Sequence, residues 1–308
     1  MGFFALSTSW NALGHSDAKE LLFEIKQVGF SKIELSFNLT RSMVDGIGRA
    51  ADELAIKVIS AHNYCPIPDG LEREKALPDC FAMSSVDPQE RAAAVKFTKR
   101  TIDTAAGVGA KAVVLHCGRV ELPERTMALI SLYEKGLKDT REFRELKSDI
   151  IRQRRDKYKS FLDNTLKSLD EINKYAQRRK ICLGIETRFY YREIPSFEEI
   201  GIILDKFRGS AIFYWHDTGH AQLMENLGMA RHKDFLECYA DRMLGIHLHD
   251  IKGCSDHQPP SRGELDFAML IPYLKKDTLK VIEAHHPATA EELKEARVYL
   301  EKVLDGAA

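Results

Sequence analysis

Short apolar runs alternate with longer amphipathic segments along the whole chain. Eight of these runs are rich in β-branched and aromatic residues and lack the polar alternation of a half-exposed strand, which indicates strands buried on both faces. Repeated strand–helix alternation predicts a parallel sheet, and eight repeats predict that the sheet closes into a (β/α)8 barrel. The predicted strands are 3–8, 32–37, 57–62, 111–117, 181–187, 211–217, 244–250 and 279–285.

The segments between these strands carry apolar residues at helical spacing, and several begin with recognisable caps. Ser16 and Asp17 precede one helix, and Thr289 with Glu292 forms a capping-box pattern before the last. The whole chain, 1–308, is therefore expected to form one TIM-barrel domain. The predicted helices are 17–28, 43–55, 89–107, 154–178, 196–207, 229–239, 266–274 and 290–304.

Two connections are longer than a barrel requires. About 60 residues separate the fourth and fifth predicted strands, against roughly 30 for a whole βαβ unit. The surplus at 118–153 is highly charged but keeps helical apolar spacing, so it is interpreted as a helical insertion that serves as a lid or an oligomer contact. Residues 63–90 contain several prolines and little periodicity, which predicts a rim loop.

Composition narrows the function classes only slightly. The 45 Lys and Arg nearly cancel the 46 Asp and Glu, so no general attraction to nucleic acid or to anionic lipid is expected. The N-terminal sequence has neither a basic leader nor an apolar run of membrane-spanning length, and a cytoplasmic location is expected. Six cysteines without a CxxC pair indicate a reduced compartment and exclude a zinc ribbon.

Ionisable side chains occur at the carboxyl end of almost every predicted strand. In a (β/α)8 barrel these ends converge on one mouth, where the active site forms. Burying so many carboxylates and imidazoles together is costly unless a cation compensates them. Oxygen and imidazole ligands without thiolates suit Zn²⁺, Mn²⁺, Co²⁺ or Mg²⁺. The residues at or near these ends are Glu34, His62, His116, Glu186, Asp217, His220, His247, His249, Asp250, Glu283 and His285.

Each of these residues also has a purely structural interpretation. A single strand-end histidine such as His62 or His116 can be satisfied by a backbone carbonyl, and Asp217 could cap the helix that follows it. Glu186 and Glu283 are harder to explain in this way, because apolar residues bury their strands right up to the carboxylate. The inference of a metal site therefore depends on the joint pattern.

Seven short motifs follow one another along nearly the whole chain. They are "GFSKIELS" (29–36), "VVLHCG" (113–118), "LGIETR" (183–188), "DTGH" (217–220), "GIHLHD" (245–250), "GELDF" (263–267) and "VIEAH" (281–285). In this order they resemble the motifs of the xylose isomerase-like superfamily of TIM barrels, which includes sugar-phosphate isomerases and epimerases and the zinc-type apurinic-site endonucleases. The combination of motifs is specific for the superfamily but not for a substrate.

The resemblance implies a divalent metal ion held by Glu186, Asp217, His247 and Glu283. His249 occupies a position that is not a ligand in the family pattern, so it is assigned to the surroundings of the site.

The endonuclease branch of the superfamily implies additional ligands. His62 and His116, together with Glu186, match a second metal site, and His220 and His257 match a third. In the third site the acid of the family's D-x-H pair is displaced, because this chain reads Ser-Asp-His and places the acid directly before His257. One metal ion is therefore expected, with a second left open and His257 kept as a further candidate ligand.

The leading interpretation is a metal-dependent isomerase or epimerase that acts on a sugar, a sugar phosphate or a keto-polyol as a small-molecule substrate. By resemblance Glu186 and Glu283 would exchange a proton next to a metal-polarised carbonyl. The remaining substrate contacts are assigned to His220, Arg188, His62 and Trp10.

Three other classes remain open. A dehydratase or lyase on a keto-cyclitol or shikimate-like substrate would use the same ion and the same proton abstraction. A zinc-dependent apurinic-site endonuclease is disfavoured by the balanced charge and by the acidic rim loop 63–90. A non-catalytic sugar-binding barrel would not need two opposed carboxylates. A homo-oligomer is compatible with each class.

Overall fold

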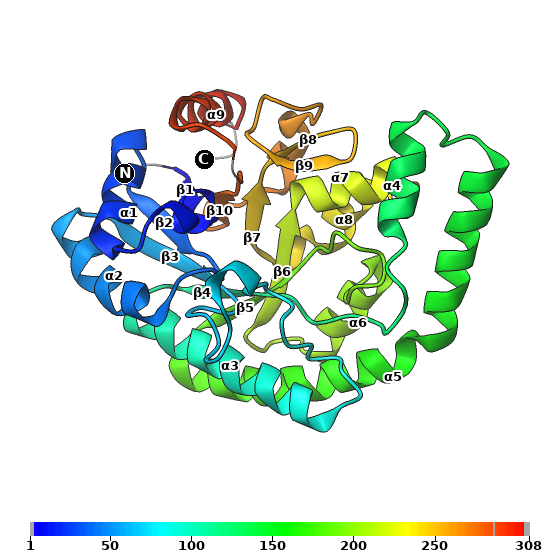
Figure 1. Ribbon diagram of the computed structural model, residues 1–308, viewed down its shortest axis with the longest axis horizontal. Helices are drawn as coiled ribbons and strands as arrows, with labels where there is room; N and C mark the ends of the chain where they lie inside the picture. The colour runs from blue at the N-terminus through cyan, green and yellow to red at the C-terminus, as the bar shows by residue number, and fades with distance from the viewer. Residues whose placement is uncertain (1–2, 286, 305–308) are drawn as a thin grey trace.

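The computed structural model describes residues 3–285 and 287–304, and within these ranges eight parallel strands close into a barrel surrounded by helices (Figure 1). The strand order around the barrel is β1-β10-β7-β6-β5-β4-β3-β2, which confirms the predicted (β/α)8 fold. The strands are β1 (Ala5–Ser7), β2 (Lys32–Leu35), β3 (Lys57–His62), β4 (Ala112–Leu115), β5 (Cys182–Glu186), β6 (Ile212–Asp217), β7 (Met243–Leu248) and β10 (Leu279–Ile282).

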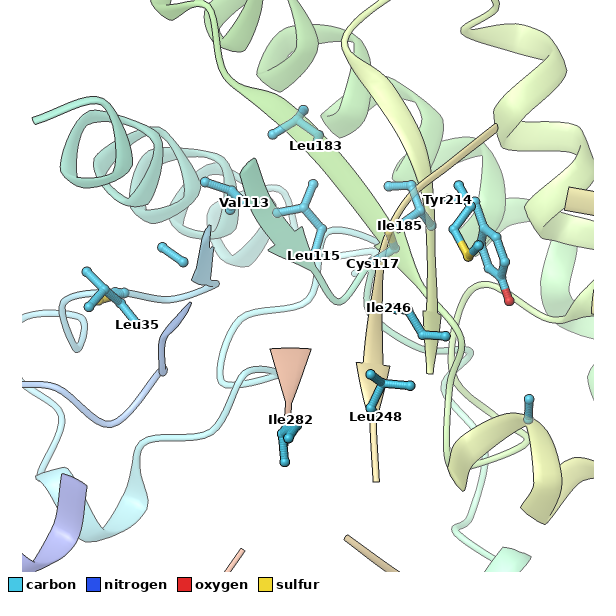
Figure 2. Packing of buried hydrophobic residues seen from close by; sticks show 14 of the residues in the cluster. Leu35, Val113, Leu115, Cys117, Leu183, Ile185, Tyr214, Ile246, Leu248 and Ile282 are labelled. Atoms are coloured by element: carbon cyan, nitrogen blue, oxygen red, sulfur yellow. The ribbon is translucent and has the colours of Figure 1, made fainter. Parts of the chain in front are cut away.

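Two layers of apolar side chains stabilise the barrel because successive strand residues point to opposite faces. The larger layer lies between strands and helices and includes Val113, Leu115 and Ile185 (Figure 2). A smaller cluster containing Trp215 forms the inner layer. Gly184 makes room for this indole, since a Cβ there would lie 2.7 Å from Trp215 Cε3. Trp215 therefore packs in the core.

The helices largely follow the predicted positions. Asp17 accepts hydrogen bonds from the first-turn N–H groups of α1, and Thr289 with Glu292 forms the capping box of α9. The helices are α1 (Ala18–Val28), α2 (Arg41–Glu53), α3 (Pro88–Gly107), α4 (Thr126–Glu134), α5 (Arg141–Arg179), α6 (Phe197–Lys206), α7 (Thr218–Asn226), α8 (His232–Tyr239) and α9 (Ala290–Val303), with short 3-10 helices η1 (Thr8–Trp10), η2 (Ala12–Gly14), η3 (Arg73–Lys75), η4 (Ala240–Arg242) and η5 (Phe267–Tyr273).

The insertion between β4 and β5 is helical, as predicted, but its boundary differs. The 39 residues of α5 run without interruption through position 153, so the last part of the insertion and the predicted barrel helix 154–178 are one helix. α4 and the start of α5 form a helical hairpin at the right of Figure 1. The charged sequence near position 153 carries no signal for a helix end, because it contains neither proline nor glycine.

Three other features differ from the sequence prediction. The segment 266–274 contains a 3-10 helix rather than an α-helix, and Pro272 lies inside it. α7 is an additional helix directly after β6, whereas the predicted helix 229–239 corresponds to α8. A hairpin of β8 (Asp250–Lys252) and β9 (Ser255–Gln258) follows β7 and was not predicted.

The rim loop 63–90 lies between β3 and α3 and contains η3. Among the helices of the described ranges, none is both long enough and apolar enough to cross a membrane.

Candidate metal centre

Four buried side chains converge at the carboxyl ends of β5, β6, β7 and β10. Each of Glu186, Asp217, His247 and Glu283 offers one ligand atom, and these atoms all lie within 4.8 Å of one another. None of the four residues is more than 4% exposed. The chain thus gathers three carboxylates and one imidazole, called here the central cluster, where water cannot screen their charges.

One imidazole nitrogen stands among the three carboxylates. Nδ1 of His247 lies 2.7 Å from Glu186 Oε1, 2.9 Å from Glu283 Oε2 and 3.7 Å from Asp217 Oδ2. On the other side of the ring, Nε2 lies 2.9 Å from Glu34 Oε1. A single Nδ1 proton cannot compensate three buried carboxylates, so this donor set fits a divalent cation.

Glu34 orients the His247 ring. If Nε2–H of His247 donates to Glu34, the Nδ1 lone pair faces the other carboxylates, which is the orientation that a metal ligand needs. Ser60 holds Glu34 in turn by donating its hydroxyl to Oε2 at 2.7 Å. Glu34, for which a structural role and a functional role were both open, therefore acts through His247.

The environment favours the ionised forms of the carboxylates. Burial raises the pKa of Glu186, but His116 and the contacts from His247 and His62 outweigh it and hold the pKa well below its usual range. Burial likewise opposes ionisation of Glu283, and the neighbouring His247 lowers its pKa well below normal. Both groups are therefore anionic at neutral pH and can bind a cation.

A second cluster, called here the side cluster, consists of His62, His116 and Glu186. Nε2 of His116 lies 2.6 Å from Glu186 Oε2, and Nε2 of His62 lies 3.6 Å from the same oxygen. Nδ1 of His62 donates to the Asn63 carbonyl at 3.0 Å, and Nδ1 of His116 lies 2.9 Å from Asp79 Oδ2. Both rings thus direct Nε2 at Glu186, as the ligands of a second metal ion would.

Arg188 is surrounded by carboxylates. Its guanidinium lies 2.9 Å from Glu186 Oε2, 3.2 Å from Glu193 Oε2 and 3.3 Å from Asp79 Oδ2. These four residues are called here the Arg188 cluster. Burial tends to lower the pKa of Arg188, but these acids more than offset it and raise the pKa above its usual value. Because its charge is already paired three times, Arg188 orients Glu186 and Asp79 and is not free to bind an anionic substrate.

Asp217 both caps a helix and faces the central cluster. Its Oδ1 accepts the backbone N–H of His220 at 2.8 Å, which caps α7, while Oδ2 faces His247. Nδ1 of His249 accepts the backbone N–H of His257 at 2.9 Å, so Nε2–H donates to Asp217. His249 thus supports Asp217 and has no nitrogen free for a metal.

The third group of candidate residues also comes together. His220 donates Nδ1–H to the Thr187 carbonyl at 3.0 Å and directs Nε2 toward Asp256 Oδ2 at 3.5 Å. The same Asp256 oxygen lies 2.8 Å from Nδ1 of His257. The displaced acid therefore reaches the same two histidines, although it precedes His257 directly. His285 stacks on His257 with ring centroids 3.8 Å apart.

Two residues lie away from this group. Trp10 donates its indole N–H to the Ala288 carbonyl at 2.7 Å and does not line the cavity, so its predicted substrate contact has no geometric support. His216 points into the outer layer, where it contacts Tyr214 and His232 at 2.7 and 3.0 Å, as expected from alternation along the strand.

A cavity of about 390 Å³ opens above the clusters. It is called here the mouth cavity, and its size lies within the range of small-molecule sites. Its lining includes most of the candidate residues and several that the sequence did not indicate. The lining residues are Phe37, His62, Leu77, Pro78, Asp79, His116, Glu186, Arg188, Phe189, Tyr190, Glu193, His220, Asp256, His257, Glu283 and His285.

Asp79 is the main residue that sequence reasoning missed. It lies in a loop, where no periodicity shows which way a side chain points. For Asp79, the available signal was an acid in a long loop directly after a strand that ends in a histidine.

Comparison with known proteins identifies relatives of the same architecture. A family model described as xylose isomerase-like TIM barrel matches residues 22–303. An uncharacterized protein of Sinorhizobium fredii, y4fM, is 22% identical over 256 residues, which cover 79% of this chain and 72% of the relative.

Solved structures agree with this fold assignment. A D-tagatose 3-epimerase-like protein superposes with a TM-score of 0.69 at 17% identity, over 99% of this chain and 97% of the other. The 3-keto-D-glucoside 4-epimerase YcjR of E. coli superposes with a TM-score of 0.68 at 16% identity, over 98% of this chain and all of the other. At these identities the likeness concerns the fold.

Proposed function

Because the chain belongs to the xylose isomerase-like TIM barrel family, we propose that it is a divalent-metal-dependent isomerase or epimerase of small keto-sugars. The observation that carries the proposal is the central cluster, in which three buried carboxylates meet at one imidazole nitrogen and two of them line the mouth cavity. The solved relatives with epimerase names support the same class of substrate.

The proposed metal ligands are Glu186, Asp217, His247 and Glu283. When bound there, a divalent cation would supply Lewis acidity that polarises a substrate carbonyl and makes the neighbouring C–H more acidic. Mn²⁺, Zn²⁺, Co²⁺ and Mg²⁺ all suit three carboxylates and one imidazole. A second ion at the side cluster is part of the proposal, with Glu186 as the shared ligand.

Glu186 and Glu283 are the proposed catalytic residues. Both are buried and anionic, and both line the mouth cavity, so each can hold a proton taken from a bound substrate. One carboxylate removes the proton from the carbon next to the carbonyl, and the other returns a proton from the opposite face. Return of a proton to the same carbon inverts it, whereas return to the former carbonyl carbon, with transfer of the hydroxyl proton to the former carbonyl oxygen, moves the carbonyl.

The other cavity residues bind or position. His220 lines the cavity and would hydrogen-bond substrate oxygens through Nε2, since Nδ1 is held by Thr187. His62 would contact substrate only where the side cluster holds no ion. Arg188 holds Glu186 in place, which adjusts the expectation that it binds substrate directly.

Deuterium wash-in tests the proposal. The metal-loaded protein, incubated with a panel of free ketoses in D2O, should place deuterium at the carbon next to the carbonyl of at least one of them. Glu283→Gln should slow this exchange at least about 100-fold, as expected for loss of a proton-transfer group. Glu20→Gln, on an exposed face of α1, is the matched control and should exchange normally. A protein that exchanges no ketose proton contradicts the proposal.

A second candidate function follows from the side cluster and from the group of His220, Asp256 and His257. Several neighbouring metal ions would also suit hydrolysis of a phosphodiester bond, such as the bond beside an abasic site in DNA. Cleavage of an abasic duplex without deuterium exchange would favour this candidate. A dehydratase or lyase would instead show exchange together with loss of water from the product.

A further inference from the structure

One side of the mouth cavity carries a group of apolar side chains. Phe37 follows β2, Leu77 and Pro78 follow β3, and Phe189 and Tyr190 follow β5, and together they form what we call the apolar rim. Because β2 to β5 are consecutive around the barrel, these residues lie on one side of the cavity. The same side also carries the polar lining residues His62, Asp79, His116, Glu186, Arg188 and Glu193. The lining residues at the ends of β6, β7 and β10 are all polar, namely His220, Asp256, His257, Glu283 and His285.

The apolar rim is the more exposed part of its side of the cavity. Leu77 is 59% exposed although it lines the cavity, whereas Glu186 and His62 on the same side are 1% and 3% exposed. Exposed apolar surface beside a polar cavity often marks a ligand contact.

The rim is tied to the proposed reaction centre. Leu77 and Pro78 directly precede Asp79, whose carboxylate contacts His116 and Arg188 at 2.9 and 3.3 Å. These contacts hold the rim loop at a fixed place over the cavity.

Phe189 anchors the other part of the rim. Its ring packs edge-on against His220 at 5.7 Å and against Tyr190 at 4.8 Å between centroids. An aromatic surface therefore begins beside the residue that would bind substrate oxygens and continues outward.

The described residues that line the cavity include no lysine, and Arg188 is their one guanidinium. Both of its terminal nitrogens are in ion pairs, Nη1 with Glu186 and Nη2 with Asp79 and Glu193. A phosphate or carboxylate on the substrate would therefore find no unpaired Arg or Lys among these lining residues.

We propose that the apolar rim is a subsite for an apolar aglycone, so that the preferred ligands are keto-glycosides with an aryl group or an alkyl group larger than methyl. The inference rests on the proposed function, because it places the keto-sugar at the central cluster and the aglycone farther out. A cavity of about 390 Å³ with buried polar groups inside and an exposed apolar rim suits such a two-part ligand.

Binding of two glucosides tests the subsite without requiring turnover. Dissociation constants of phenyl and methyl β-D-glucopyranoside for the metal-loaded protein can be measured by calorimetry or by ligand-observed NMR. The phenyl compound should bind at least about tenfold more tightly, because its ring is removed from water against the rim. D-fructose 6-phosphate should bind no more tightly than D-fructose.

Two exposed apolar residues of the same loop provide a matched pair of variants. Leu77→Ser should reduce the preference for the phenyl compound to less than about threefold, and Leu77→Met should retain it. Val86 is 60% exposed but does not line the cavity, so Val86→Ser should leave the preference unchanged. Since both side chains are largely exposed, these variants are expected to fold normally.

Equal affinity for the two glucosides overturns the inference, as does no binding of either at its highest soluble concentration or tighter binding of the phosphate ester. These outcomes are separable from the proposed function. If ketoses exchange deuterium but the phenyl group gives no preference, the subsite is absent and the enzyme proposal stands. If the phenyl group is preferred but no keto-sugar exchanges, the subsite stands and the enzyme proposal falls.

Discussion

Two buried basic groups in this barrel, the Arg188 guanidinium and Nδ1 of His247, each face three carboxylates, and they differ in how far they compensate them. Arg188 is always charged and presents several N–H donors, so it can pair with Glu186, Asp79 and Glu193 at once. His247 presents only Nδ1 to Glu186, Asp217 and Glu283, because Nε2 is held by Glu34. Each carboxylate of the Arg188 cluster therefore has a permanent cationic partner, whereas the central cluster offers its three carboxylates a single ring nitrogen and needs an additional cation.

Glu186 belongs to both clusters. Its Oε2 faces Arg188 and His116, and its Oε1 faces His247. One oxygen is thus fixed by permanent partners while the other is directed to the site where a metal would bind. The fold thus positions a reactive carboxylate by giving permanent partners to only one of its two oxygens.

Metal removal should produce the largest difference between the clusters. If a divalent cation compensates the central cluster, saturating metal at about 1,000 times its Kd should stabilise the protein by about 4 kcal/mol relative to the chelated form. Urea unfolding with EDTA and with added Mn²⁺ or Zn²⁺ measures this difference. It should become smaller in Asp217→Asn combined with Glu283→Gln, where only the side cluster keeps its ligands, and an equal difference in that variant would contradict a cation at the central cluster.

Replacing the guanidinium tests the Arg188 cluster. Arg188→Met leaves three carboxylates without their permanent cation and should cost about 3 kcal/mol or more of unfolding free energy, measured in urea with metal present. Arg188→Lys should recover part of this loss. The control is Arg192→Met, since Arg192 donates to the Leu122 carbonyl, and this change should cost about 1 kcal/mol. Similar losses of unfolding free energy in Arg188→Met and Arg192→Met would contradict the role of Arg188 as the cationic partner of three carboxylates.

Asp79 tests whether the rim loop acts on the reaction centre. Asp79→Asn keeps the shape of the side chain but removes the charge beside His116 and Arg188, so proton exchange should slow about tenfold. Asp69→Asn is the control, because Asp69 lies in the same loop and pairs with Arg100 at the surface. If both variants exchange at the wild-type rate, Asp79 does not position the site.

The smallest expected effect lies behind the site, at His232. Burial lowers the pKa of His232 to about 4, so the folded protein keeps it neutral while the unfolded chain takes up a proton below about pH 6.5. Its contribution to stability is complete above that pH and is lost as the pH falls toward 4, by at most about 1.4 kcal/mol per pH unit.

Unfolding free energies at two pH values between 4 and 6.5 measure this slope. His232→Gln should reduce the slope by about one proton, with no change in the difference between metal-loaded and chelated protein. An unchanged slope would mean that His232 is not responsible.

The residues at strand ends could be predicted because two constraints coincide there. Alternation along a strand decides which side chains face the barrel axis, and parallel closure brings the strand ends together, so the sequence is enough to place Glu186 and His247 at the barrel mouth. Asp217 shows the limit of treating alternatives as exclusive, because its two oxygens cap α7 and face the central cluster at once.

Loop residues could not be predicted in the same way. Asp79 reaches His116 only through the path of the rim loop, which tertiary packing determines. The β8–β9 hairpin similarly brings Asp256 between His220 and His257, although its position in the sequence argued against such a contact. Helix ends within charged, proline-free sequence were also beyond prediction, which explains the misplaced boundary inside α5.

The central claim is that the buried carboxylates around His247 hold a divalent cation. Elemental analysis of the protein, purified without chelators and dialysed against metal-free buffer, tests it most directly. The account predicts at least one divalent ion per chain in the wild type and in Asp79→Asn, and loss of that ion in Asp217→Asn combined with Glu283→Gln. A wild-type protein that carries no ion, and binds none when Mn²⁺, Zn²⁺, Co²⁺ or Mg²⁺ is added, would contradict it.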